Sequence, residues 1–221
     1  MEFDEYLAQI PQLHTWDGGK TWNSGGFEAS QLKELHEFLS TRLPHRPVTL
    51  ETGAGNSTIT ICFLDPARHT VICPDGGVLE RIRSFLAQAG ISSTFLDIKQ
   101  NLSEWVLPDI ARSTREGEPL LDFALIDGGH NWPTVFVDFF YVNFMLSNGG
   151  YLMIDDVQLH SVKELGRFLS QDPRFSLSLD MGKSLVFQKQ STDRYIGEWN
   201  TSPYILQMTE KYAQQANPFA L

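Results

Sequence analysis

The chain has 221 residues, of which 42% are hydrophobic and 12% aromatic, a composition typical of a folded globular protein rather than a disordered one. Its formal net charge of −10 argues against binding along nucleic acid or to an anionic membrane. We find neither a secretion signal nor an apolar stretch long enough to span a bilayer. Cys62 and Cys73 lie in apolar runs without the spacing of a zinc or redox motif, which predicts buried, reduced thiols in a cytoplasmic protein.

Residues 1–26 are rich in aromatic residues and glycine, and we expect a flap on the domain surface that could also serve as a lid. Helical periodicity then begins near Phe27 and ends before Pro44. Further along, strand-like apolar runs occur at residues 48–51, 70–73, 93–96, 121–126, 151–154, 175–179 and 184–188. Helix-like segments between them occupy residues 59–64, 78–89, 103–110 and 135–146. Another helix is expected to open at a capping box formed by Ser161 and Glu164.

This alternation predicts an α/β fold with a Rossmann-like, mostly parallel sheet and helices on both faces. The hairpin at residues 175–188 would add a reversed last strand, which makes seven strands in all. Residues 112–119 are expected to form a solvated loop, and residues 148–150 to end a helix. The domain would span residues 27–190, followed by a polar tail, 191–221, that could be a lid, an oligomer contact or a loosely held terminus.

The first predicted strand ends in a glycine-bearing turn with the sequence ETGAGNST at residues 51–58. Gly53 and Gly55 allow a sharp turn and let a ligand approach the backbone closely. The helix that follows directs free N–H groups and the positive end of its dipole toward that ligand. A phosphate-binding P-loop would need lysine in place of Asn56, and a dinucleotide-binding turn would need glycine in place of Thr58.

Acidic residues follow several of the predicted strands. Asp75 comes after the second strand, Asp127 and His130 after the fourth, and Asp155 and Asp156 after the fifth. Because ligands of open parallel sheets bind beyond the carboxyl ends of the strands, these side chains are expected to converge. We expect no lysine or arginine among them, and neighbouring carboxylates raise each other's pKa unless a positive charge arrives. A metal ion and a sulfonium cofactor would each supply that charge.

Two stretches carry a resemblance to a known family. The turn with Glu51, two glycines and Ser57 resembles the first motif of class I S-adenosylmethionine (SAM) dependent methyltransferases. The segments IDGGHNWPTVFVD at residues 126–138 and LSNGGYLMIDD at residues 146–156 resemble the metal-dependent O-methyltransferases that act on macrolide sugars, and more distantly the catechol type. The resemblance covers residues 27–190. It implies methyl transfer from SAM to a hydroxyl of a small molecule, such as a glycosylated natural product or a phenol.

The same resemblance assigns chemical roles. It implies that Asp127, Asp155 and Asp156 bind magnesium, and that His130 accepts the proton of the acceptor hydroxyl, with Asp127 sharing in catalysis. Hard oxygen ligands suit Mg²⁺, and a metal-bound hydroxyl loses its proton more easily. A histidine has the intrinsic pKa to accept that proton near neutrality.

For the cofactor, the resemblance implies contacts to the methionine part of SAM from the first turn. The candidates there are Glu51, Gly53, Gly55, Asn56 and Ser57. The family usually has an acid at the end of the second strand to bind the ribose hydroxyls. Cys73 stands at that position here, and Asp75, two residues further on, is the expected replacement.

Structural interpretations remain open beside these roles. Asp127 could cap a helix, Asp155 and Asp156 could form a solvated turn, and His130 could be a structural histidine. Asp138 is expected to be solvated or paired. Three other functions are considered: a metal-independent methyltransferase, a binding protein without turnover, and a nicotinamide-dependent oxidoreductase, which the missing third glycine disfavours. No nucleic-acid or membrane partner is expected, and a homo-oligomer is one option.

Overall fold

The computed structural model describes residues 1–115 and 120–214. In these parts of the chain, seven strands form one sheet in the order β3-β2-β1-β4-β5-β7-β6. The strands are β1 (Val48–Thr52), β2 (Arg68–Ile72), β3 (Leu96–Lys99), β4 (Leu121–Ile126), β5 (Leu146–Ile154), β6 (Phe175–Asp180) and β7 (Leu185–Lys189). Strands β1 to β5 pair in parallel, and β7 is antiparallel to both of its neighbours. This confirms the predicted Rossmann-like sheet with a reversed last strand.

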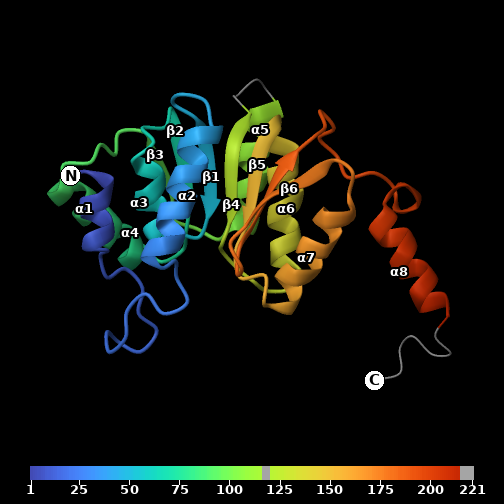
Figure 1. Cartoon of the computed structure of the whole chain (residues 1–221), viewed down its shortest axis with the longest axis horizontal. Coiled ribbons are helices and arrows are strands. Elements are labelled where there is room, and N and C mark those ends of the chain that lie inside the picture. Colours follow the sequence, from blue (N-terminus) through green and yellow to red (C-terminus); the bar gives the residue numbers. More distant parts are fainter. Residues whose placement is uncertain (116–119, 215–221) are drawn as a thin grey trace.

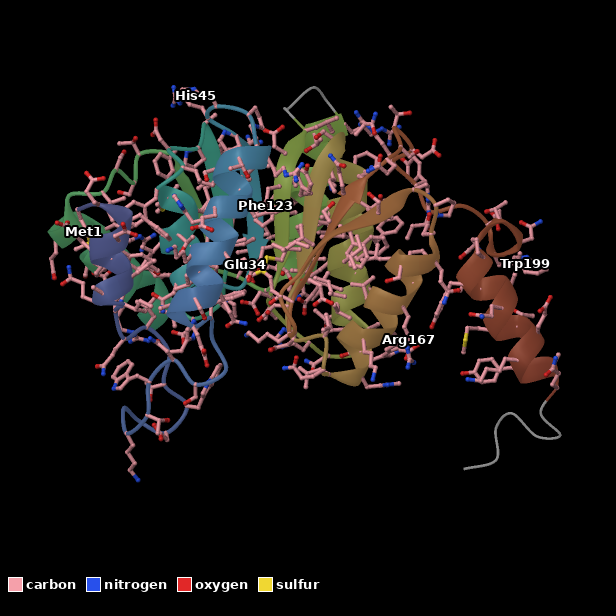
Figure 2. The ribbon with its side chains drawn as sticks, in the orientation of Figure 1. Met1, Glu34, His45, Phe123, Arg167 and Trp199 are labelled. Carbon is pink, nitrogen blue, oxygen red and sulfur yellow. The ribbon has the colours of Figure 1, made fainter. Side chains whose placement is uncertain are left out.

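Helices cover both faces of the sheet (Figure 1). One face carries α2 (Ala29–Arg42), α3 (Asn56–Cys62) and α4 (Gly76–Ala89), and the other carries α5 (Ser103–Arg115), α6 (Thr134–Met145) and α7 (His160–Gln171). Along β4, Phe123 and Leu125 join the core on the first face, while Ala124 and Ile126 join the core on the second. Figure 2 shows Phe123 among the side chains that fill the molecule. Because both faces are buried, β4 is a continuous apolar run from Phe123 to Ile126 rather than an alternating one.

Helices α1 (Phe3–Ala8) and α8 (Pro203–Ala213), the first and last helices of the described chain, lie at opposite sides of the molecule (Figure 1). Helix α1 packs against α2, and Tyr6 and Leu13 are fully buried in the core of that face. The short helix η1 (Trp199–Thr201) leads to α8, which lies beyond α7 and has no buried residue. The division into a flap, a domain and a tail at residues 26 and 190 stays a prediction, and residues 215–221 lie outside the described part.

Two predicted boundaries are wrong near the edge of the sheet. Strand β3 begins at Leu96 rather than at residue 93, because its pairing with β2 starts where His69 faces Leu96. An edge strand is positioned by one neighbour, so its apolar pattern is a weak guide to its ends. Helix α5 continues to Arg115, through part of the segment expected to be a loop, and residues 116–119 lie outside the described part.

Two further predictions fail in the second half of the chain. Residues 148–150 do not end helix α6, because β5 begins at Leu146 directly after the helix and its register shifts before Tyr151. Ser161 is not a helix cap, because Leu159 occupies the N-cap position of α7. The Ser161 hydroxyl instead donates to the backbone carbonyl of His130. Within the described residues, no helix has the length and apolar character needed to cross a membrane.

Candidate active site

A cavity of about 580 Å³ opens at the carboxyl ends of β1, β2 and β4. Loops that follow these strands supply much of its wall, among them residues Gly53, Asp75, Asp127 and His130. Asp156 follows β5 and completes this part of the wall. The volume lies in the range of small-molecule sites, and the position agrees with the carboxyl-end rule for parallel sheets.

Gly53 brings the ends of β1 and β4 into contact. Its φ angle of +91° lies in the region that favours glycine, and a Cβ added there would overlap the backbone carbonyl of Asp127. The Gly53 amide donates to the carbonyl of Ile72 (2.9 Å), and the Asp127 amide donates to the carbonyl of Thr52 (3.0 Å). The turn is therefore part of the sheet edge as well as part of the cavity wall.

Three predicted cofactor residues lie behind this turn. Glu51 is only 1% exposed and accepts hydrogen bonds from the hydroxyls of Ser57 (3.0 Å) and Thr58. Asn56 accepts hydrogen bonds from the Tyr6 phenol at its backbone carbonyl (3.0 Å) and its Oδ1 atom (3.2 Å). These contacts hold the start of α3 against β1 and the flap. Binding of SAM by Glu51, Asn56 and Ser57 stays a prediction, and their observed contacts shape the turn.

Asp75 lies in the cavity wall next to Cys73. It is the N-cap of α4, and its Oδ1 atom accepts hydrogen bonds from the amides of Gly77 (2.8 Å) and Val78 (3.1 Å). Among the described residues, no donor bonds to its Oδ2 atom, so one carboxylate oxygen of an exposed side chain is left for a ligand. Cys62 and Cys73 are buried free thiols, as expected.

His130 lies between two carboxylates. Its Nε2 atom is 3.7 Å from Asp127 Oδ1, and its Nδ1 atom is 3.7 Å from Asp156 Oδ2. The Nε2 atom is buried and has no hydrogen-bond partner within the described ranges. The hydrogen bond from Ser161 fixes the backbone of His130 and ties the loop after β4 to α7. The sequence interpretation missed this contact because it assigned the Ser161 hydroxyl to a helix cap.

Asp127 and His130 shift each other's pKa. Burial raises the pKa of Asp127 to about 7, and the charge of Asp155 raises it further. The neighbouring imidazole of His130 lowers the pKa of Asp127 in part. The neighbouring carboxylate of Asp127 raises the pKa of His130, although burial alone would lower it. Because the two titrations are linked, the Asp127–His130 pair can take up or release a proton close to neutral pH.

Asp155 lies behind the cavity wall and is 2% exposed. Its Oδ2 atom is 2.8 Å from the ammonium nitrogen of Lys183, and its Oδ1 atom accepts a hydrogen bond from the Ser184 hydroxyl. The Lys183 ammonium is also 3.6 Å from Asp156 Oδ1. The expectation that no lysine or arginine lies among these acids is therefore wrong. The topology explains why: β6 is parallel to β5, so the β6–β7 turn that carries Lys183 reaches the same sheet edge as Asp155.

The three-carboxylate magnesium site implied by the resemblance does not fit this arrangement. Both oxygens of Asp155 are bonded, and a positive charge already lies beside Asp155 and Asp156. In the part of the chain that the structure describes, the group that could hold a metal is Asp127, His130 and Asp156, with one donor atom from each within 4.8 Å of the others. That group includes an imidazole nitrogen, whereas Mg²⁺ prefers oxygen ligands. Magnesium binding by Asp127, Asp155 and Asp156 stays a prediction.

The flap supplies part of the wall that sequence analysis did not assign. His14 Nε2 donates a hydrogen bond to the carbonyl of Ala54 in the glycine turn (2.6 Å), and Trp16 stacks on His14 with 6.0 Å between ring centroids. Both residues, together with residues 24–26, line the cavity. Figure 1 shows this N-terminal loop below the sheet, at the edge where β1 ends. Its aromatic and glycine-rich composition was a signal for a lid but not for particular residues.

Asp138 differs from expectation, because it is neither solvated nor paired. It is fully buried on α6, and neither carboxylate oxygen has a hydrogen-bond partner among residues 1–115 and 120–214. Burial raises its pKa to about 6. An acid whose pKa is higher in the folded state loses stability as pH rises from about 4 to about 6.

We therefore expect Asp138→Asn to be more stable than the unmodified protein at pH 8, by roughly 1–3 kcal/mol, because it removes a buried charge. The difference should shrink at pH 5, where folded Asp138 carries a proton. Urea unfolding at both pH values measures this. Asp109→Asn, which changes an exposed carboxylate on α5, is the control and should show no such dependence. A destabilised Asp138→Asn variant at pH 8 would contradict the prediction.

The comparisons with known proteins agree with this geometry. Residues 50–157 match the family model of a methyltransferase domain. The O-methyltransferase TomG from Streptomyces achromogenes, involved in tomaymycin synthesis and solved with SAM, is 17% identical, with a TM-score of 0.63 over 85% of this chain and 96% of that chain. The O-methyltransferase from Bacillus cereus, solved with S-adenosylhomocysteine (SAH), is 16% identical, with a TM-score of 0.58 over 85% and 90%.

A third similar structure is an rRNA methylase from Streptococcus thermophilus, 16% identical, with a TM-score of 0.52 over 72% of this chain and 95% of that chain. The search of curated proteins gave no match. The matched domain and the sheet topology make the chain similar to class I methyltransferases, the class that uses SAM. Two of the similar solved structures are O-methyltransferases.

Proposed function

We propose that this protein transfers the methyl group of SAM to a hydroxyl of a small molecule, with His130 as the proton acceptor. The observation that carries the proposal is the position of His130 between Asp127 and Asp156, in the wall of the cavity that the Gly53 turn also lines. A base and a cofactor turn in one cavity are the two parts that O-methylation requires.

In the proposed reaction, the backbone around Gly53 and Ala54 binds the methionine part of SAM, and the unbonded Oδ2 atom of Asp75 binds a ribose hydroxyl. The acceptor oxygen attacks the methyl carbon as the carbon–sulfur bond breaks, so the sulfonium leaves as the neutral sulfide of SAH. The acceptor proton moves to His130. Asp127 and Asp156 stabilise the imidazolium that forms and keep its ring in place. The chain's main contribution is alignment of the two reactants.

The acceptor is part of the proposal. A small hydroxylated molecule, either a glycosylated natural product or a phenol, is favoured because flap residues such as His14 and Trp16 narrow the cavity. The net charge of −10 also disfavours an RNA acceptor, although the similar rRNA methylase indicates that this fold can serve one. A cytoplasmic location and a homo-oligomer stay predictions. The magnesium site implied by the sequence resemblance is not part of this proposal, and no step above requires a metal ion.

Cofactor binding is the first test. We expect SAM and SAH to raise the melting temperature by several degrees, with a nicotinamide cofactor having no effect, because only ligands that bind the native state stabilise it. Isothermal titration should show that Asp75→Asn weakens SAM binding about tenfold, since the ribose loses a charged acceptor while asparagine still caps α4. SAH release with a panel of hydroxylated acceptors then tests turnover.

The alternatives predict other outcomes. A folded protein that shows no SAM binding at millimolar cofactor would be a binding protein on this fold. A melting temperature raised by the nicotinamide cofactor but not by SAM would indicate an oxidoreductase. An Asp75→Asn variant with unchanged SAM affinity would remove Asp75 from the ribose site and leave the rest of the proposal intact.

A further inference from the structure

We propose that Lys183 is the resident cation of this active site: its ammonium group holds Asp155 and Asp156 in position for methyl transfer, so that the reaction proceeds without a divalent metal ion. The inference rests on the proposed function and names a positioning residue that the sequence resemblance did not indicate. It follows from what surrounds the Lys183 side chain.

The Lys183 ammonium is surrounded by acceptors. It donates to Asp155 Oδ2 (2.8 Å) and to the backbone carbonyl of Gly25 (2.8 Å), and it lies 3.6 Å from Asp156 Oδ1. It also lies 4.7 Å from the centroid of the Phe27 ring, a favourable position for a cation. Two of the three ammonium donors make these hydrogen bonds, while Asp156 and the Phe27 ring interact with its charge. The side chain is therefore bound in one place rather than free in solvent.

The backbone also holds the lysine at the sheet edge. The carbonyl of Lys183 accepts a hydrogen bond from the amide of Val157 (2.9 Å), which directly follows the two aspartates. The Lys183 amide donates to the carbonyl of Met181 (3.1 Å) within the β6–β7 turn. The β6–β7 turn is therefore hydrogen-bonded to the loop after β5. This bond holds the Lys183 backbone at a constant distance from Asp155 and Asp156.

The charge balance of the cluster depends on this residue. Asp127, Asp155 and Asp156 bring three carboxylates to one edge, and Asp155 is almost completely buried. Removing one partner of a buried ion pair leaves an uncompensated charge, which is strongly destabilising. A tethered ammonium supplies the compensation without a separate binding event, and it repels a divalent cation from the same oxygens.

Asp156 connects the lysine to the proposed base. One of its carboxylate oxygens, Oδ1, accepts a hydrogen bond from Gln158 Nε2 (2.8 Å) and lies 3.6 Å from the Lys183 ammonium. The other, Oδ2, lies 3.7 Å from His130 Nδ1. Gln158 and Lys183 together therefore orient Asp156, and the Lys183 charge reaches the imidazole through that carboxylate. The contact with the carbonyl of Gly25 adds the flap to the same unit. We expect loss of the lysine to affect kcat more than SAM binding.

The experiment compares metal binding and turnover in matched variants. Lys183→Met keeps the length of the side chain and removes its charge, Lys183→Arg keeps the charge, and Lys163→Met changes an exposed lysine on α7 as a control. Binding of Mn²⁺ is followed by electron paramagnetic resonance on metal-free protein without substrate. Turnover is followed as SAH release with and without EDTA, and SAM affinity by isothermal titration.

We expect the unmodified protein and Lys163→Met to bind no Mn²⁺ at about 1 mM and to keep full activity in EDTA. Lys183→Met should bind Mn²⁺, because the freed carboxylates attract a hard cation, and should lose about 30-fold or more in kcat with SAM affinity changed less than about threefold. Magnesium should restore part of this activity, and Lys183→Arg should retain most of it without metal.

Three results would overturn the inference, and the first two do not require a folded lysine variant. The first is stoichiometric Mn²⁺ binding to the unmodified protein that Asp156→Asn abolishes. The second is loss of activity in EDTA that magnesium reverses. If no acceptor is methylated or SAM does not bind, the proposed function fails, while the comparison of Mn²⁺ binding still decides the role of Lys183. Equal Mn²⁺ binding by the unmodified protein and Lys183→Met would also overturn it.

Discussion

His130→Ala is expected to lower kcat by roughly two to four orders of magnitude while SAM affinity stays nearly unchanged. The imidazole faces the cavity between Asp127 and Asp156, and in the proposed reaction it takes the acceptor proton as the carbon–oxygen bond forms. None of its observed contacts involves the glycine turn, so cofactor binding does not depend on it directly. Steady-state kinetics with SAH detection gives kcat, and isothermal titration gives the SAM affinity.

His160→Ala provides the matched control for this variant. His160 begins α7, and its side chain is 83% exposed, so its removal should change neither quantity. A wild-type rate in His130→Ala would remove His130 from the mechanism. If His130→Ala lost SAM binding as well as turnover, the histidine would support the structure of the cavity. Unfolding curves of the variant would distinguish this local effect from a general loss of structure.

Gly53→Ala is expected to abolish SAM binding and to lower the free energy of unfolding by roughly 3 kcal/mol or more, because strain at positive φ is added to a backbone clash. The added Cβ overlaps the carbonyl of Asp127, so the variant must separate the ends of β1 and β4. The loss thus arises from distortion of the sheet edge as well as from occlusion of the cofactor. Gly53→Val should lower the free energy of unfolding further, because its larger side chain adds to the same backbone clash.

The control for this substitution is Gly90→Ala. Gly90 ends α4 with a φ angle of +67°, and a Cβ there meets nothing within 4 Å. It isolates the cost of a positive φ, about 1–2 kcal/mol, and should leave SAM affinity intact. Urea unfolding and isothermal titration of both variants separate conformation from contact. A Gly53→Ala variant with normal stability that still binds SAM would mean that the turn has another role.

The sequence was sufficient for most of the sheet because its central strands are short, mostly apolar segments between turns and helices. Strand β4 was predicted at its observed bounds, since burial on both faces requires such a segment. Strand β3 was misplaced because its start depends on pairing with β2, which local composition does not encode. The start of β5 was missed because the glycines after α6 resemble a helix stop, whereas the strand begins before them and shifts register there.

The candidate site was predictable where it consists of residues that directly follow strands. Gly53, Asp75, Asp127, His130 and Asp156 were identified by that rule, and all five line the cavity. Residues brought in by tertiary contacts were not. Lys183 arrives through the pairing of β6 and β7, and Ser161 arrives through the packing of α7. The flap residues lie outside any motif, so no local pattern could place them.

The two halves of the flap have different surroundings. Tyr6 and Leu13 anchor its first half in the core, while Trp16 and residues 24–26 face the cavity. The matched methyltransferase domain at residues 50–157 contains the cofactor turn but none of these flap residues. Under the proposed function, we expect changes between residues 15 and 24 to alter the choice of acceptor, while the cofactor turn and the hydrophobic anchor remain as they are. Acceptor choice and cofactor binding would then depend on different segments of the chain.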